Sequence, residues 1–328
     1  MLSPHKILFL FTLILGSLIS ISSSSWLGIW MGLEINLLSM IPLMNESNNP
    51  LTTEASIKYF IVQALASSVL LMTILTSQMM SEFTSSIMME SVLFTKMGAA
   101  PFHYWFPEVM DGLSWGSGLI LMTWQKLAPM VILMYIPLIN SFTLIIITAS
   151  MMISGIFGIN QTSLRKIMAF SSINHIGWML SAILFNESLW LIYFLVYSLI
   201  SSSILWTFNN SSMFQMKQFM GSSMNSPIKM LFSLNFLSLG GIPPFLGFFP
   251  KWLIIQTLTE SGLYMTTLMM VILTLLPLYF YIRLSLSSLV LSTENINTFK
   301  STKTQLASTL NITSILGLIF CTFIFNFQ

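Results

Sequence analysis

Long apolar runs dominate this sequence and restrict its fold more than any other feature. Eleven runs of about 20 predominantly apolar residues, the length with which an α-helix crosses a bilayer, follow one another between polar or proline-rich breaks. We therefore predict an all-α polytopic membrane protein with about 11 transmembrane helices. Their expected bounds are 7–23, 26–44, 55–79, 86–107, 115–136, 142–159, 167–185, 189–208, 230–259, 263–283 and 306–326.

Composition excludes the main soluble classes. Only 7% of the 328 residues are charged, whereas a soluble domain carries about 25%. A soluble enzyme, a nucleic-acid-binding protein and a disordered chain are all excluded on this ground. The single cysteine, Cys321, permits no internal disulfide and no cysteine metal cluster. Since no nucleophile–base pair, phosphate loop or dinucleotide motif occurs either, we expect no cofactor, no metal and no chemical reaction in this chain.

The charged loop residues predict the orientation in the membrane. When the chain is threaded with its N-terminus on side one, the basic loop residues all fall on that side. The positive-inside rule places side one in the cytoplasm or, for a mitochondrial protein, in the matrix. Eleven spans then place the C-terminus on the opposite side. Side one receives His5, Lys6, Arg165, Lys166, Lys217, Lys229, Arg283, Lys300 and Lys303, whereas side two receives Glu82, Glu187 and Glu260.

An internal repeat marks two of the predicted spans. The pattern Gly98-x-x-Pro101-Phe102-x-x-x-Phe106-Pro107 recurs with the same spacing from Gly241 to Pro250. Proline breaks a helix, and freed backbone groups at membrane depth are tolerated only beside protein or water. Both spans are therefore predicted to be discontinuous helices. The helix-breaking residues are Gly98, Pro101, Pro107, Gly241, Pro243, Pro244 and Pro250.

The repeat predicts the domain organisation. The two copies lie five spans apart, an odd number, so they would have opposite orientations. An inverted repeat with paired broken helices is typical of ion-coupled transporters. We expect a first five-helix unit over 1–136, broken around 96–107, and a second, inverted unit over 142–283, broken around 238–252. A matrix loop and a C-terminal helix would occupy 284–328.

Four charged residues are predicted near the middle of spans. They are Glu34, Lys96, Lys126 and Lys251. A charge at that depth costs several kcal/mol, so such residues face a protein interior or a water-filled path and usually carry ions or protons. A lysine can bind and release a proton there, and a nearby carboxylate alters its proton affinity. These four are the candidate proton-translocating residues; a static pair, in which Lys96 only neutralises Glu34, is the alternative.

Other polar residues are candidates for a relay or a supporting role. Lys58 lies near a helix start, from which its long side chain can reach the interface. Glu108 also lies near an interface. His103 and His175 are expected more as packed or hydrogen-bonded residues than as relays.

Several local motifs closely resemble the chain-2 family of mitochondrial NADH:ubiquinone oxidoreductase, respiratory complex I. The Met-rich composition and short N-terminus resemble an animal, arthropod-type, mitochondrially encoded member. The motifs are Trp30-Met-Gly-Leu-Glu34-Ile-Asn, Glu54-Ala-Ser-Ile-Lys58-Tyr-Phe, Lys96-Met-Gly-Ala-Ala-Pro101-Phe-His-Tyr-Trp-Phe-Pro-Glu108, Thr123-Trp-Gln-Lys126-Leu-Ala-Pro, Asn160-Gln-Thr-Ser-Leu-Arg165-Lys, Ser172-Ile-Asn-His175-Ile-Gly-Trp and Leu239-Gly-Gly-Ile-Pro-Pro244-Phe-Leu-Gly-Phe-Phe-Pro-Lys251-Trp.

The resemblance implies an antiporter-like, proton-pumping subunit in the membrane arm of complex I, in the mitochondrial inner membrane. It implies that Glu34 pairs with Lys96, that Lys126 is the central lysine and that Lys251 lies near the exit. It also implies that flavin, iron–sulfur clusters and ubiquinone belong to partner subunits. Neighbouring antiporter-like subunits and bound phospholipid are the expected partners. Two alternatives remain open: a stand-alone cation/proton antiporter, and a membrane scaffold subunit that does not pump.

Overall fold

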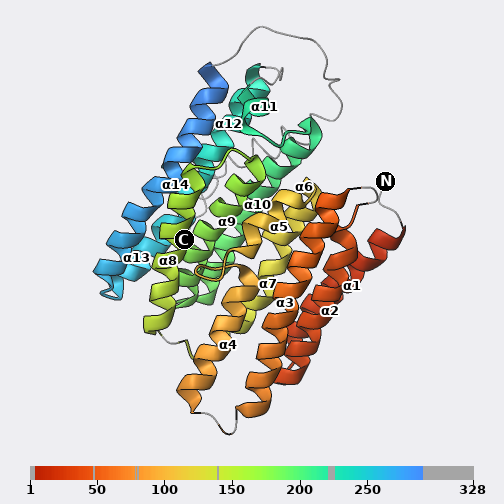
Figure 1. Ribbon diagram of the computed structural model, residues 1–328. Coiled ribbons are helices and arrows are strands. Elements are labelled where there is room, and N and C mark those ends of the chain that lie inside the picture. Colours follow the sequence, from red (N-terminus) through yellow and green to blue (C-terminus); the bar gives the residue numbers. More distant parts are fainter. Residues whose placement is uncertain are drawn as a thin grey trace, which may run out of the picture. The chain divides into compact units, whose positions relative to one another are not determined.

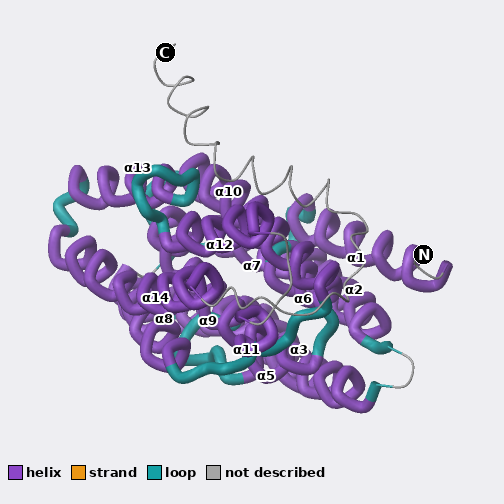
Figure 2. Tube along the Cα trace, turned by 90° about the horizontal axis from the view of Figure 1, so that it is seen from above, coloured by secondary structure: helices purple, strands orange, loops and turns teal. Residues whose placement is uncertain are grey.

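The computed structural model describes residues 4–46, 49–77, 79, 81–138, 140–220 and 226–290. These residues form helices joined mostly by short loops (Figure 1, Figure 2). The chain divides into two compact units, Met1–Ala149 and Ser150–Gln328. The division lies inside one helix, α8, whereas the predicted boundary between the repeat units lies before it.

The first unit runs from red to yellow in Figure 1. In this unit α3 packs against α2, α4 and α5, and α7 packs against α1, α4 and α6. Its helices are α1 (Pro4–Ser22), α2 (Trp26–Met44), α3 (Pro50–Thr76), α4 (Glu82–Met97), α5 (Trp105–Gly112), α6 (Trp115–Met122), α7 (Trp124–Met134) and the first half of α8 (Asn140–Ile159).

The second unit continues through green to blue. Here α10 packs against α9, α12 and α13, and α14 packs against α9, α11, α12 and α13. Besides the second half of α8, its helices are α9 (Leu164–Ile183), α10 (Glu187–Ser211), α11 (Met216–Met220), α12 (Ser226–Gly240), α13 (Phe248–Glu260) and α14 (Tyr264–Val290).

Ten of the eleven predicted spans coincide with one or two of these helices. The eleventh, 306–326, and Cys321 lie outside the described residues, so the count of eleven stays a prediction. Seven stretches in the described part of the chain have the length and apolarity to cross a membrane. They are Pro4–Ser22, Trp26–Met44, Pro50–Thr76, Trp115–Met134, Ser141–Ile159, Glu187–Ser211 and Tyr264–Leu286.

Small residues bring α1 and α2 into close contact, which positions the α2 segment that carries Glu34. A Cβ atom on Gly32 would lie 2.5 Å from the backbone nitrogen of Ser20, and one on Gly16 would lie 2.9 Å from that of Asn36. Small residues at helix interfaces allow such backbone approach in membrane proteins. The Gly32 side of α2 is therefore held against α1.

Both predicted helix breaks are confirmed, and they have the same backbone structure. The first half-helices α4 and α12 end at equivalent positions of the repeat, Met97 and Gly240, and the second half-helices α5 and α13 begin at equivalent positions, Trp105 and Phe248. The same backbone N–H to carbonyl bonds occur at both breaks. At the first break they are Gly98 to Phe94 and Thr95, Ala99 to Phe94, and Phe106 to His103. At the second break they are Gly241 to Leu237 and Ser238, Ile242 to Leu237, and Phe249 to Leu246.

The glycine that ends each first half-helix is required by its backbone conformation. Gly98 has φ +76° and Gly241 has φ +78°, in the left-handed region that favours glycine. The two copies of the repeat therefore share their backbone structure and hydrogen bonds as well as their sequence. The opposite orientation of the two copies stays a prediction.

A further interruption was not predicted. The span expected over 115–136 consists of α6 and α7, separated at Thr123, which has φ −112° and ψ −71°. The hydroxyl of Thr123 donates to the carbonyl of Leu119 at 2.7 Å. Hydroxyl groups that bond to preceding carbonyls often bend helices. In a sequence, however, a threonine indicates a helix interruption less clearly than a proline does.

Candidate functional site

The break after α4 places Lys96 inside the first unit. Lys96 is the penultimate residue of α4, one position before the helix ends, and 7% of it is exposed. Gln63 on α3 donates from Nε2 to its backbone carbonyl at 3.3 Å. The lysine is therefore buried against α3, at the point where the helical hydrogen-bond ladder stops.

Glu34 is the predicted acidic partner of Lys96. It lies on α2, is half-buried, and is near enough to interact electrostatically with Lys96. In the described part of the chain no direct ion pair joins the two side chains. The structure thus brings the pair into one neighbourhood without a fixed salt bridge.

Lys126 lies shortly after the interruption at Thr123. It is on α7, only 1% exposed, and its Nζ lies 5.6 Å from the centre of the Phe106 ring. Phe106 belongs to α5, the helix that follows the break. The face of an aromatic ring attracts a lysine ammonium group. The break therefore supplies one of the groups that surround Lys126.

A partly buried amide network adjoins Lys126 and was not predicted. Gln125 donates from Nε2 to Asn36 Oδ1 at 2.9 Å, and its Oε1 accepts from the hydroxyl of Tyr59 at 3.4 Å. The three residues connect α2, α3 and α7. Asn36 is close in sequence to Glu34 and Gln125 directly precedes Lys126, so the network links the neighbourhoods of two candidate residues. The sequence feature that could have indicated this network is the presence of polar side chains within apolar runs.

Lys58 and Glu108 lie at an exposed position rather than among the buried residues. Lys58 Nζ forms ion pairs with Glu108 at 2.9 Å and Glu54 at 3.0 Å, and all three side chains are between 42% and 62% exposed. The pair with Glu108 connects α3 with α5, whereas the pair with Glu54 lies within α3. The structure therefore gives Lys58 and Glu108 surface contacts that join the second half-helix to its neighbour.

His103 packs within the first break. Only 2% of it is exposed, its Nδ1 lies 3.3 Å from the carbonyl oxygen of Pro101, and its ring lies against Tyr104. A backbone carbonyl next to Nδ1 favours the tautomer that carries the proton on that nitrogen. This arrangement matches the packed role expected for it.

The second break places Lys251 inside the second unit. Its Nζ donates to the carbonyl oxygens of Gly240 at 2.8 Å and Leu239 at 3.3 Å, at the end of α12. The last carbonyls of a helix lack helical partners and carry partial negative charge, so they stabilise an ammonium group. The ring centre of Trp178 lies 5.8 Å from Nζ. Gly241 leaves room for this side chain, because a Cβ there would lie 2.9 Å from Nζ.

The repeat does not place equivalent charges in the two units. The position in the first copy that is equivalent to Lys251 is Glu108, which is exposed, whereas Lys251 is 7% exposed. The position in the second copy that is equivalent to Lys96 is Leu239, whose carbonyl accepts a bond from Lys251. The buried amine thus comes from the helix before the break in one unit and from the helix after it in the other.

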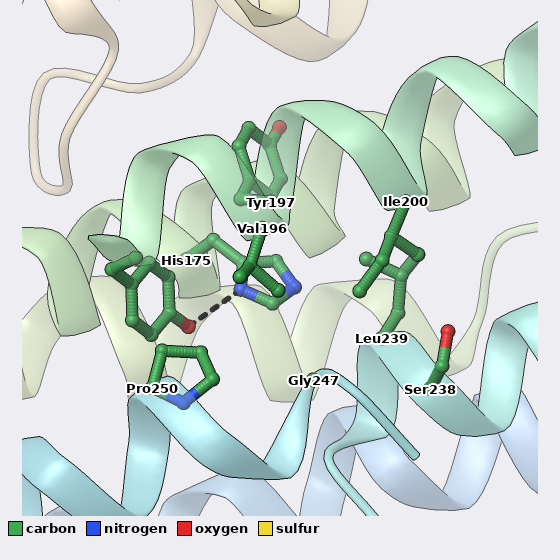
Figure 3. Close-up of a pocket in the computed structure, with 9 residues that line it drawn as sticks. His175, Val196, Tyr197, Ile200, Ser238, Leu239, Gly247 and Pro250 are labelled. Atoms are coloured by element: carbon green, nitrogen blue, oxygen red, sulfur yellow. Dashed lines mark hydrogen bonds between the residues drawn. The ribbon is translucent and has the colours of Figure 1, made fainter. Parts of the chain in front are cut away.

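His175 borders a small cavity in the second unit (Figure 3). Its Nδ1 lies 2.7 Å from the hydroxyl oxygen of Tyr193, shown by the dashed line, and its ring packs against Tyr197. The cavity lies between α10 on one side and the second break with its flanking helices on the other. Its lining residues are His175, Tyr193, Val196, Tyr197, Ile200, Ser238, Leu239, Gly247 and Pro250.

This cavity lies beside the break that positions Lys251. Leu239 lines it and also supplies a carbonyl oxygen to Lys251. Gly247 packs directly on the carbonyl oxygen of Ser238, a contact that any side chain at this position would prevent. His175 and Lys251 are therefore close neighbours of the same broken helix, although the structure shows no direct bond between them in the described residues.

One buried acid was not singled out from the sequence. Glu90 on α4 is fully buried, with 0% exposed. It lies inside the predicted span 86–107, so its position within an apolar run was the signal that could have identified it. The first unit thus contains a fully buried carboxylate in addition to the half-buried Glu34.

Comparisons with known proteins show the family and the fold of the chain. A family model described as NADH:quinone oxidoreductase/Mrp antiporter, TM, matches residues 23–95 and 76–277. The NADH-ubiquinone oxidoreductase chain 2 of Anopheles gambiae is 52% identical over 332 residues, which cover 97% of each chain.

Solved structures share the fold. A chain of respiratory complex I from Thermus thermophilus, with bound aureothin, superposes with a TM-score of 0.87 at 21% identity, covering 96% of this chain and 78% of that one. A chain of the Mrp complex from Dietzia sp. DQ12-45-1b superposes with a TM-score of 0.78 at 18% identity, covering 90% and 62%. This chain has the antiporter-like membrane fold, and it belongs to the family of NADH-ubiquinone oxidoreductase chain 2.

Proposed function

We propose that this chain is a proton-translocating, antiporter-like subunit in the membrane arm of respiratory complex I. The observation that carries the proposal is the burial of three lysines beside interruptions in apolar helices. Lys96, Lys126 and Lys251 are 7%, 1% and 7% exposed. Intramembrane charges are costly and mark ion or proton pathways, and a chain of this family has the fold to use them.

The residues would act by holding and releasing protons. In the first unit, movement of Glu34 relative to Lys96 would alter how strongly the amine holds its proton. Lys126, next to the Gln125 amide network and facing an aromatic ring, would be the central site. In the second unit, Lys251 would hold its proton against the carbonyl end of α12 until its release.

The redox chemistry would take place elsewhere in the assembly. Complex I couples NADH oxidation by ubiquinone to proton pumping, so this chain would be part of an H+-translocating NADH:ubiquinone reductase without redox chemistry of its own. Flavin, iron–sulfur clusters and ubiquinone would be bound by partner subunits. Its neighbours would be other membrane-arm subunits, including antiporter-like ones, with phospholipid between them.

Location and orientation follow from family and charge. We place the chain in the mitochondrial inner membrane, with the N-terminus in the matrix and the C-terminus in the intermembrane space. The loops around Arg165 and Lys217, both assigned to the matrix, contact each other, which supports their lying on one side of the membrane. They pair through Leu164 N–H to the carbonyl of Phe214 at 2.9 Å, and Arg165 packs over the Phe214 ring.

The test of the proposed function is the replacement of Lys126 in the assembled complex. Lys126→Ala should assemble normally and lose NADH-driven proton uptake into vesicles by about two orders of magnitude, since proton-transfer groups contribute on this scale. Lys217→Ala, which removes an exposed amine, is the matched control and should pump normally. A complex of normal composition that pumps fully with Lys126→Ala would establish the scaffold alternative instead.

The stand-alone antiporter remains the second candidate, because the chain also superposes on a chain of an Mrp complex. It predicts that the purified chain alone exchanges cations for protons in liposomes. Co-purification with a flavin- and iron–sulfur-containing assembly, and inactivity when isolated, support the complex I subunit.

A further inference from the structure

Glu90 is a fully buried carboxylate in the first unit. It lies on α4, between the exposed Glu82 at the start of the helix and Lys96 near its end. With a rise of about 1.5 Å per residue, it lies about 12 Å along the helix axis from Glu82 and about 9 Å from Lys96. The acid is therefore placed between the end of α4 assigned to side two and a buried amine.

The surroundings of Glu90 show that it faces the interior of the unit. Residues one turn away on the same helix, Ser86 and Phe94, are buried as well. The Phe94 ring contacts the ring of Phe142 at the start of α8, with 5.9 Å between their centres. Helices α3 and α7 also pack against α4. The carboxylate thus lies inside the helix bundle and not against lipid.

The charges of the first unit give this acid a functional context. Lys96 lies on the same helix and Lys126 lies on α7, which packs against it. Glu34 and Glu90 together are two acids, equal in number to these two buried amines. Burial of a carboxylate costs several kcal/mol, and an apolar residue of similar size would avoid that cost. A proton-carrying role accounts for the retention of an acid at this depth.

We propose that Glu90 is a proton-binding residue in the path of the first unit, between the side-two end of α4 and the buried lysines. A protonated lysine gives up a proton as its N–H bond breaks, and the proton passes, through intervening water, to the Glu90 carboxylate, where an O–H bond forms. That O–H bond breaks when the proton is released at the side-two end to a water molecule, which becomes hydronium, in the direction of pumping. This inference deepens the proposed function and rests on it.

Replacement of the acid on an otherwise normal complex tests the inference. Glu90→Gln keeps the shape of the side chain and removes its proton-binding site, while Glu82→Gln removes an exposed acid from the same helix as the matched control. We expect Glu90→Gln to assemble like Glu82→Gln and to lower NADH-driven proton pumping by about tenfold or more. Glu90→Asp, which keeps a carboxyl group, should restore part of the loss. Normal pumping by assembled Glu90→Gln would overturn the inference.

A measurement on the native complex covers the case in which Glu90→Gln does not assemble. A hydrophobic carbodiimide reacts with protonated carboxyl groups in apolar surroundings. Peptide mass spectra of complex inhibited during turnover should show an adduct on Glu90. Complete inhibition with Glu90 unmodified would contradict the proposal.

The Lys126→Ala variant separates this inference from the function on which it rests. If Lys126→Ala and Glu90→Gln both pump normally, the proton-translocating function of the chain is wrong. If Lys126→Ala stops pumping and Glu90→Gln does not, only the role of Glu90 is wrong.

Discussion

At the scale of single residues, backbone conformation and buried charge depend on each other at the second break. Gly241 has a left-handed backbone, and the space above it is filled by the Lys251 side chain. The carbonyl of the preceding residue, Gly240, accepts the shortest bond from Lys251 Nζ. The glycine thus ends α12 and at the same time leaves the space in which the lysine reaches the helix end.

Gly241→Ala should therefore disturb both the helix end and the lysine. A non-glycine residue in the left-handed region costs about 1–2 kcal/mol, and the added Cβ would lie 2.8 Å from Lys251 Cδ. We expect a lower melting temperature of the complex and weaker proton pumping. Gly240→Ala is the control, because a Cβ there meets ordinary contacts, the nearest with Tyr281 at 3.5 Å. Equal behaviour of the two variants would contradict this account.

The hydroxyl of Tyr193 should contribute to stability through His175. Tyr193→Phe removes the partner 2.7 Å from Nδ1 and leaves the rings packed. Loss of a buried hydrogen bond costs about 1–3 kcal/mol, which should lower the melting temperature of the complex. The same change at the exposed Tyr264 should have no effect. If His175 is a packed residue, as the sequence favours, Tyr193→Phe will leave the number of protons pumped per NADH unchanged; a lower ratio would indicate a relay.

The buried lysines could be predicted from the sequence, whereas their partners could not. Lys96, Lys126 and Lys251 stood out because a charge inside an apolar run is rare, and the structure buries all three. The partners of each amine could not be derived, because they come from other helices or from the backbone. Every residue has a backbone carbonyl, so the sequence does not single out the Gly240 carbonyl that binds Lys251. The Asn36–Gln125 bond joins residues 89 positions apart.

At the scale of helices, the breaks were predictable where glycine and proline mark them. The two half-helix pairs end and begin again at equivalent positions of the repeated motif, as the motif predicts. The interruption at Thr123 has no proline, and only its position within a polar-containing stretch distinguishes it from a continuous helix. A hydroxyl bond to the preceding turn depends on the local backbone, so the sequence alone did not reveal it.

The ion pairs of Lys58 should matter little to pumping. The pair with Glu108 links α3 to the half-helix α5 and the pair with Glu54 lies within α3, but all three side chains are substantially exposed, and exposed ion pairs contribute little because water screens them. We expect Lys58→Met to assemble and pump nearly as the unmodified chain, with Glu54→Gln as the matched single-pair control. Strong loss of pumping in Lys58→Met alone would instead support a relay role for this lysine.

At the scale of the whole molecule, the distribution of charge should determine which side each loop faces. The basic loop residues are assigned to the matrix and Glu82, Glu187 and Glu260 to the intermembrane space. Lys217 is exposed on α11, which makes it a suitable reporter. A membrane-impermeant amine reagent should label Lys217 in inside-out inner-membrane vesicles and not in right-side-out mitoplasts. A water-soluble carbodiimide with an amine tag should label the exposed Glu260 with the opposite preference. Labelling of both residues from one side would show a miscounted span between them, and reversal of both would invert the predicted orientation.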